Sequence, residues 1–195
     1  SEARWEVRQR ADGSYQSVVV DTFKSYHENG NLKAESPYIV MEIADGNFQL
    51  LIEGIQITYY PSGELLAENP YKIFPLADGS YQSLIEGVQK EYFTSGALFA
   101  ENPYVVKRLA DGSYQSLKEG IQKYFHDSGS VAKQSTVARY VLRELADGSY
   151  QSLVEGTFEY YFEDGTLSGA DPFVVVESLA GGSFQSLIQG VSKRY

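Results

Sequence analysis

The fold is decided by the stretch ADGSYQSLIEGVQKEYFTSGALFAENPYVVKRL, residues 77–109, because altered copies of it recur along the whole chain. Aligned on their ADG-like triplets, the copies start at Ala11, Ala44, Ala77, Ala110, Ala146 and Ala180. The intervals between these starts are 33, 33, 33, 36 and 34 residues. Repetition this regular indicates that residues 1–195 form one repeat domain, whose first and last units are partial.

Two kinds of turn divide each unit. One reads ADGS or ADGN, and the other reads HENG, YPSG, FTSG, HDSG or FEDG. Asp-Gly and Asn-Gly pairs between apolar runs are strong hairpin signals, because these residues tolerate positive φ. The stretches between turns are rich in Tyr, Phe, Val, Ile and Leu and lack a helical apolar period, which favours strands. We therefore predict an all-β fold, a single elongated antiparallel meander of stacked hairpins with two strands per unit and about a dozen strands.

Glycine and proline fall at one level of neighbouring predicted strands. A hairpin centred on Ser95 sets Gly87 opposite Pro103, and the next hairpin sets Pro103 opposite Gly120. Both residue types weaken or interrupt a β ladder. The sequence thus predicts a crease along this Gly/Pro line, which bends each strand into two arms and shapes the sheet as a trough or a folded-over wrap.

The composition excludes several classes of partner and chemistry. The net charge of −10 argues against nucleic acid, and no apolar run is long enough to predict membrane insertion. Cysteine is absent, which excludes disulfides and thiolate zinc sites and leaves the compartment open. A bacterial, secreted or cell-surface location is favoured over the cytoplasm. The start at Ser1-Glu2 leads us to expect that an upstream segment has been removed.

No residue pattern predicts catalysis, a metal site or a cofactor. His27 and His126 occupy the position at which other copies have Tyr60 or Phe93, so a structural role is favoured over a catalytic or metal-binding one. The Asp residues of the ADG turns suggest calcium as an alternative to a plain turn role, but they lack the alternating acidic pattern of calcium loops. Glutamates repeated in every unit are typical of a solvated ladder rather than of an acid/base pair.

Aromatic residues in register are the main candidates for a binding site. One row and the positions beside it contain Tyr26, Tyr59, Tyr60, Tyr92, Phe93, Phe125, Tyr161 and Phe162. Such rows are typical of packing ladders in a repeat sheet, and the alternative is an exposed stripe that grips a partner segment or a sugar ring. A second row runs Trp5, Tyr38, Tyr71, Tyr104, Tyr140 and Phe173. Copy four adds three residues and places Arg139 at the crease, which suggests either a partner-specific bulge or a tolerated insertion.

The motif around the aromatic pair resembles a known family. It reads GIQITYYPSGELLAENPY at residues 54–71 and GVQKEYFTSGALFAENPY at residues 87–104. This pattern resembles the MORN repeat, and in particular its bacterial second variant, which includes antitoxin-like proteins. The resemblance implies an extended, twisted sheet of stacked hairpins that acts as a scaffold for partner proteins or, in some members, lipids. MORN units have about 23 residues, whereas this unit inserts a second hairpin through VVKRLADGSYQSL.

The sequence supports two functional hypotheses. The leading one is a non-enzymatic repeat scaffold that binds a partner protein through an extended aromatic and acidic sheet surface. The alternative is a surface adhesive or self-assembling structural module, which binds glycan or its own copies by edge-to-edge association. An enzyme whose chemistry lies in another domain is a third and weaker hypothesis.

Overall fold

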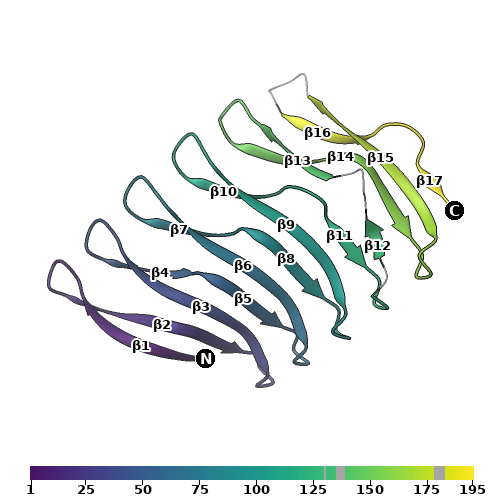
Figure 1. Cartoon of the computed structure of the whole chain (residues 1–195). Coiled ribbons are helices and arrows are strands. Elements are labelled where there is room, and N and C mark those ends of the chain that lie inside the picture. The colour runs from purple at the N-terminus through teal and green to yellow at the C-terminus, as the bar shows by residue number, and fades with distance from the viewer. Residues whose placement is uncertain (130, 135–138, 178–182) are drawn as a thin grey trace.

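The protein is a stack of β-hairpins (Figure 1). The structure, a computed structural model, describes residues 1–129, 131–134, 139–177 and 183–195. The start of the last repeat at Ala180 lies outside these residues. The first nine strands are β1 (Glu2–Gln9), β2 (Tyr15–Tyr26), β3 (Leu32–Glu42), β4 (Phe48–Ile52), β5 (Gly54–Tyr59), β6 (Leu65–Pro75), β7 (Tyr81–Ile85), β8 (Gly87–Tyr92) and β9 (Leu98–Arg108). The others are β10 (Tyr114–Lys118), β11 (Lys123–Phe125), β12 (Val131–Gln134), β13 (Arg139–Glu144), β14 (Tyr150–Tyr161), β15 (Leu167–Glu177), β16 (Phe184–Ile188) and β17 (Lys193–Arg194).

The order of the strands confirms the predicted antiparallel meander. We call one crossing of the sheet by the chain a pass. Some passes are interrupted and consist of two successive strands, namely β4/β5, β7/β8, β10/β11, β12/β13 and β16/β17. The 17 strands therefore make twelve passes. Each pass is antiparallel to the next, as in β5–β6, β6–β7 and β8–β9. All regular structure in the described part of the chain is strand. The all-β prediction is thus confirmed.

The predicted line of interruption is present, and its cause is a two-residue bulge. On β6, Tyr71 pairs with Ile85, and Glu68 pairs with Lys90. Between these two pairs β6 has two residues, 69 and 70, whereas the neighbouring pass has four, 86–89. The neighbouring pass therefore bulges by two residues. Gly87 takes up the excess with φ = +111°, a value that favours glycine, and an added Cβ there would lie 3.5 Å from Cγ of Pro70.

The predicted register is wrong by one residue. Gly87 pairs with Tyr104, and Pro103 pairs with Val88 instead. Near the turn, Tyr92 pairs with Leu98, so the hairpin is centred on Ser95 as predicted. The register then shifts between Glu91 and Tyr92. That shift is a bulge, and a bulge moves all the pairs beyond it by one residue.

The same correction applies on the other side of Pro103. Its carbonyl accepts a hydrogen bond from Glu119 N at 3.2 Å, and Gly120 bridges to Tyr140 rather than to Pro103. The proximity of Gly and Pro nevertheless holds, because Cγ of Pro103 lies 3.5 Å from where a Cβ of Gly120 would be.

The crease divides each pass into two arms, which Figure 1 shows extending in opposite directions. We call the part that ends at the ADG turns the ADG arm, and the part that ends at Tyr26, Tyr59, Tyr92, Phe125 and Tyr161 the Tyr arm. Pairing across strands also defines two faces. The amide face carries Asn69, Tyr71, Asn102 and Tyr104, and the stripe face carries Ile55, Glu68, Pro70 and Val88.

The two arms connect neighbouring units differently. In the Tyr arm, backbone pairing joins β3 to β5 and β6 to β8 near the crease. In the ADG arm, β4 pairs with β3 and β7 pairs with β6, and glutamine side chains join one hairpin to the next. Gln49 donates to the carbonyl of Tyr81 at 2.7 Å and accepts from its N–H at 2.9 Å. A side-chain amide therefore takes the place of a missing neighbouring strand.

This glutamine ladder is continuous along the ADG arm. Its members are Gln16, Gln49, Gln82, Gln115 and Gln151, and each bonds the backbone of the aromatic residue that begins the next ADG-arm strand. A serine ladder runs the other way, in which Ser83 donates to Ile52 O at 2.5 Å and Ser116 donates to Ile85 O at 2.6 Å. These side chains satisfy backbone groups that the open ladder leaves unpaired.

The buried face changes from one arm to the other. In the ADG arm the stripe face is covered, and Leu51, Leu117 and Leu153 are buried there. In the Tyr arm the amide face is covered, and Ala100 and Gln122 are buried. A right-handed twist, which is strong in two-stranded ribbons, rotates the two ends of a hairpin in opposite senses and so explains the change. Neighbouring hairpins cover one another, and for that reason the folded-over wrap that the sequence suggested is not formed.

The glutamine ladder gives a first testable prediction. The substitution Gln82→Ala leaves the N–H and carbonyl of Tyr114 unpaired between two hairpins, so we expect a loss of about 1–3 kcal/mol in the free energy of unfolding. The matched control is Gln185→Ala, because Gln185 is exposed, and its loss should stay within about 0.5 kcal/mol. Urea unfolding of both variants at low protein concentration measures the difference. Equal losses would show that the ladder does not support the stack.

Candidate protein-binding face

The predicted aromatic row lies on the stripe face of the Tyr arm, and its hydroxyl groups are bonded to carboxylates. Tyr59 donates to Glu35 at 2.8 Å, and Tyr92 donates to Glu68 at 3.1 Å. Tyr161 donates to Glu159 at 2.6 Å. The same row contains Phe125 and Tyr26. The hydrogen bond between Tyr26 and Glu2 is the main cause that raises the pKa of the Tyr26 hydroxyl. Tyr59 and Tyr92 thus bond the preceding neighbouring strand, and Tyr161 bonds a glutamate of its own strand. The row therefore combines features of both predicted alternatives, because hydrogen bonds hold its hydroxyl groups in the sheet while its rings lie on the outward face.

The second aromatic of each pair has a different place, between the hairpin ends. Tyr60 donates its hydroxyl to Tyr92 O of the next unit at 2.8 Å, and Phe93 packs edge-on against Phe99 with ring centroids 5.0 Å apart. Phe162 is exposed. The structure therefore separates Tyr60 and Phe93 from the outward-facing row. Tyr60 joins two units in a packing ladder, and Phe93 packs against its own hairpin.

The histidines take part in the same packing ladder. His27 Nε2 lies 3.0 Å from Tyr59 O, and His126 Nε2 lies 2.8 Å from Tyr161 O. Each ring thus makes the contact that the Tyr60 hydroxyl makes in the second unit. This shared contact is structural, and it is the kind of role that the sequence favours for the two histidines.

Arg139 is not part of the aromatic row. It is the exposed first residue of β13 and pairs in register with Glu155 near the crease, away from the ends of the Tyr arm. Residues 135–138, which contain most of the three-residue insertion of copy four, lie outside the described residues. The structure therefore does not bring Arg139 together with the other predicted contact residues.

The glutamates of the stripe face are paired with cations as well as with tyrosines. Lys24 lies 3.0 Å from Glu35, and Lys123 lies 3.4 Å from Glu101. The hydrogen bond from Tyr59 is the main cause that lowers the pKa of Glu35, and Lys24 adds to it. This row alternates in charge, as expected for a solvated ladder, and is less acidic than the sequence suggested.

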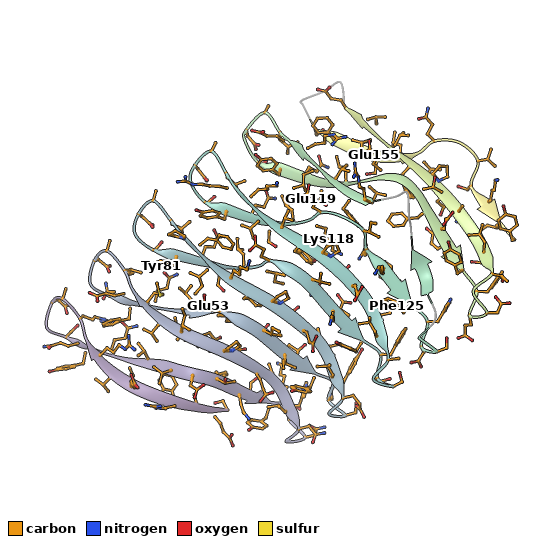
Figure 2. All side chains as sticks on the ribbon, viewed as in Figure 1. Glu53, Tyr81, Lys118, Glu119, Phe125 and Glu155 are labelled. Carbon is orange, nitrogen blue, oxygen red and sulfur yellow. The ribbon has the colours of Figure 1, made fainter. Side chains whose placement is uncertain are left out.

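A second row of glutamates runs beside the crease. Figure 2 shows Glu53, Glu119 and Glu155 following one another along the sheet. Glu86 pairs with Lys72 at 2.7 Å, and Glu155 pairs with Arg143 at 3.5 Å. The stripe face thus carries charged rows on both sides of its centre.

Between the charged rows lies an apolar stripe that the sequence analysis missed. It consists of Ile55, Val88 and Ile121, which are 56%, 48% and 44% exposed. Ile55 pairs with Pro70 and Val88 pairs with Pro103, so proline rings fill the spaces between the stripe residues. The signal was present in the sequence as a β-branched apolar residue directly after the Gly of three EG dipeptides, at intervals of 33 residues. Exposure of such residues in a row is typical of interaction surfaces.

The amide face has a row of polar contacts at the same level. Gln89 donates to Asn69 at 2.7 Å, and Gln122 donates to Asn102. In the last unit Asp171 replaces the Asn, and both of its oxygens accept bonds of 2.8 Å from Arg194. This bidentate pair holds β17 against β15.

The ADG turns have a structural explanation that needs no metal. Asp78 accepts bonds from Ser80 N at 2.9 Å and from Ser80 Oγ at 2.6 Å, and Asp12, Asp111 and Asp147 do the same with the serine two residues on. These bonds confirm the turn role. Within the described ranges no group of three or more His, Asp or Glu side chains is arranged to hold a metal ion. No helix of the described part is long and apolar enough to cross a membrane.

The fold and this face together define an all-β repeat scaffold built from stacked hairpins. A family model described as a MORN repeat variant matches residues 22–39, 52–72, 85–105 and 118–138. The chain belongs to the MORN-repeat family, and each matched segment covers a Tyr-arm hairpin and its crease. A search of curated proteins found no match. The expected bacterial origin and antitoxin-like character stay predictions.

The role of the histidines gives a second testable prediction. In His27→Tyr the new hydroxyl can donate to Tyr59 O as Tyr60 donates to Tyr92 O, so the free energy of unfolding should change by less than about 0.5 kcal/mol. His27→Phe keeps the ring and removes the hydrogen bond, which should cost about 1 kcal/mol. Thermal or urea unfolding compares the two variants. A larger loss in His27→Tyr than in His27→Phe would contradict the shared contact.

The Asp171 pair gives a third prediction, on pH. The hydrogen bonds from Arg194 are the main cause that lowers the pKa of Asp171 from 3.8 to about 2. Because the folded carboxyl stays ionised where the unfolded one binds a proton, its stabilisation is fully present above pH 3.8 and is lost as the pH falls through about 2. Asp171→Asn should therefore lower stability at neutral pH and flatten the dependence of unfolding free energy on pH in that window. An unchanged slope in urea titrations across the window would refute the coupling.

Proposed function

We propose that this chain is a non-enzymatic scaffold that binds a partner protein along the apolar stripe Ile55, Val88 and Ile121. The exposure of these residues, in register over three units, is the observation that supports the proposal. Proline rings between them make the stripe continuous, and the outward-facing tyrosines widen it on one side. Apolar and aromatic area with a polar rim is the usual composition of a protein interface.

The spacing of the stripe favours a helix as the bound segment. Successive stripe residues are two strands apart, which corresponds to about 9.5 Å at the usual strand separation. Seven residues of an α-helix rise about 10.5 Å, so a helix with one apolar position per heptad can follow the stripe across the strands. An extended segment repeats its side chains on one face every 6.6 Å or so, which does not fit.

The charged rows on both sides favour a partner helix with basic flanks. Glu35, Glu68 and Glu101 lie on one side, and Glu53, Glu86 and Glu119 lie on the other. Lysines pair with most of them at exposed positions, where such pairs are weak and can be exchanged for pairs with a partner. The net charge of −10 would also speed the approach of a basic segment.

The absence of an enzymatic role is part of the proposal. The tyrosine hydroxyls are bonded to glutamates, and the histidine rings are bonded to backbone carbonyls. Those side chains therefore serve the sheet, and a catalytic pair would need two carboxyl groups with contrasting environments.

The fourth prediction tests the binding stripe. The triple variant Ile55→Lys, Val88→Lys and Ile121→Lys should fold as the parent does, because all three side chains are exposed, and should lose partner binding by a factor of 100 or more, on the order of 3 kcal/mol. Quantitative affinity capture identifies proteins retained by the parent, and titration calorimetry with the purified partner measures the loss.

The matched control places lysine at exposed apolar positions outside the stripe, Val7, Leu50 and Leu187. Capture should survive in this control. A partner that binds both triple variants equally, or turnover of a substrate by the parent protein, would refute the proposed function.

A further inference from the structure

The apolar stripe has a polar residue of the repeat beyond each of its ends. The position that holds Ile55, Val88 and Ile121 holds Thr22 in the unit before and Thr157 in the unit after. Thr22 pairs with Pro37, and Thr157 pairs with Pro172, as the stripe residues pair with their prolines. The apolar part of the row therefore covers three units, and the residues at its two ends define how a bound segment fits.

Asp21 marks one end of the stripe. It directly precedes Thr22 and occupies the position that is glycine in the other units. Those glycines have positive φ, and they are Gly54, Gly87, Gly120, Gly156 and Gly190. Asp21 is exposed and keeps the same conformation, with φ = +75°, although it has a side chain. Strain of this kind is typical of ligand-binding positions.

The side chain of Asp21 starts on the stripe face. At the matching position of the third unit, an added Cβ of Gly87 would lie 3.5 Å from Cγ of Pro70, which belongs to the stripe face. Asp21 Oδ1 accepts a hydrogen bond of 2.8 Å from Thr22 N. The carboxylate is therefore held beside the end of the stripe.

Arg139 marks the other end of the stripe. Gly120 bridges to Tyr140 in an antiparallel ladder, so the next residue, Ile121, lies opposite Arg139. In the second and third units this place is taken by the proline that pairs with the stripe residue. Arg139 replaces that apolar ring with an exposed guanidinium.

The two ends of the stripe differ in charge. Within the described residues neither Asp21 nor Arg139 takes part in an ion pair, whereas the neighbouring charges Arg4 and Glu155 are each paired with another side chain. The end at Asp21 is therefore negative, and the end at Arg139 is positive.

The distance between these charges corresponds to a helix of defined length. Seven strand spacings separate β2 from the pass that contains β13, which corresponds to about 33 Å at the usual strand separation. An α-helix covers that distance with about 22 residues, or three heptads.

We propose that the partner helix binds in one direction, with its N-terminal end at Asp21 and its C-terminal end at Arg139. This inference rests on the proposed function and adds the length and the orientation of the bound segment. The first N–H groups of a helix carry partial positive charge and the last carbonyl groups carry partial negative charge, so each end meets opposite charge. The guanidinium can also donate hydrogen bonds to the last carbonyl groups. The reverse orientation brings like charges together at both ends.

Paramagnetic labelling measures the direction of binding. The probe is a synthetic helical peptide of three heptads, with one leucine per heptad, lysine at the flanking positions, and acetylated and amidated ends. One sample carries a nitroxide at the N-terminal residue, and a second sample carries it at the C-terminal residue. The N-terminal label should broaden the amide signals of Thr22 and Tyr38, and the C-terminal label should broaden those of Ile121 and Tyr140.

The outcomes separate this inference from the proposed function. Equal broadening at both ends by each label, or the reversed pattern, would overturn the orientation and leave binding along the stripe intact. A peptide that does not bind, or that binds without any effect on the signal of Val88, would refute the proposed function and remove the inference with it.

Neutral variants test the contribution of each end charge. Arg139→Gln and Asp21→Asn should each weaken binding of the peptide about threefold, because an exposed charge interacts modestly with one helix end. Asparagine tolerates positive φ, so the second variant keeps the backbone conformation. The matched controls are Arg108→Gln and Glu28→Gln, which remove the same charges at exposed positions near the tips of the arms. Calorimetry at about 0.1 M salt should show unchanged affinity in the controls, since charges farther apart than about 10 Å are then screened.

Exchange of the two charges tests the direction itself. The double variant Asp21→Arg and Arg139→Asp keeps the net charge, and the N-terminal label should now broaden Ile121 instead of Thr22. Arg139→Asp alone leaves both ends negative and should remove the preference for one direction. Urea unfolding verifies that the variants are folded. An unchanged direction in a folded variant, or equal losses of affinity in the neutral variants and their controls, would contradict the orientation.

Discussion

The twist of two-stranded ribbons is the constraint on which the structure depends. Twelve passes of this length cannot stay in one flat sheet, because right-handed twist rotates each hairpin away from its neighbours. In the described residues, strand pairing between units is therefore found near the crease, as between Glu68 and Lys90. Farther out, backbone donors and acceptors lose their partners and require others. The glutamines, serines, histidines and Tyr60 supply those bonds, which explains why polar residues recur in the covered parts of the stack.

The same constraint explains why the repeat unit is longer than the motif of its family. The matched segments, such as residues 85–105, cover the Tyr arm and the crease, and residues between matches form the ADG arm. That added arm has few backbone bonds between units, so the leucines of its stripe face and the Gln49 type of contact must hold it together. Because the repeat is regular, one glutamine in each unit is enough to bond the backbone of the following hairpin. The stack is in effect a linear series of equivalent contacts.

The sequence predicted the strands and the turns well because these depend on local chemistry. The ADG turns, the alternation of the meander and the level of the crease follow from Asp, Gly and Pro at fixed offsets. The register failed by one residue because a bulge such as that between Glu91 and Tyr92 has no distinct sequence signal in this unit. The aromatic row was found, but its separation from Tyr60 and Phe93 was not, because the two adjacent rings look alike until the twist is known. The stripe was missed because exposure of Ile55 depends on which face each arm covers.

The place of the proposed binding stripe follows from where the sheet is continuous. In both arms one face of each hairpin is covered by its neighbour, so a partner that approached there would meet separate edges. Near the crease, Glu86 N donates to Pro70 O and Glu119 N donates to Pro103 O, which keeps successive units in one ladder. Only at this level does the stripe face run uninterrupted from unit to unit, with Val88 and Ile121 beyond the reach of the neighbouring hairpins. The partner segment that we propose would follow this level across the described sheet, where the surface is apolar along its centre and charged along both sides.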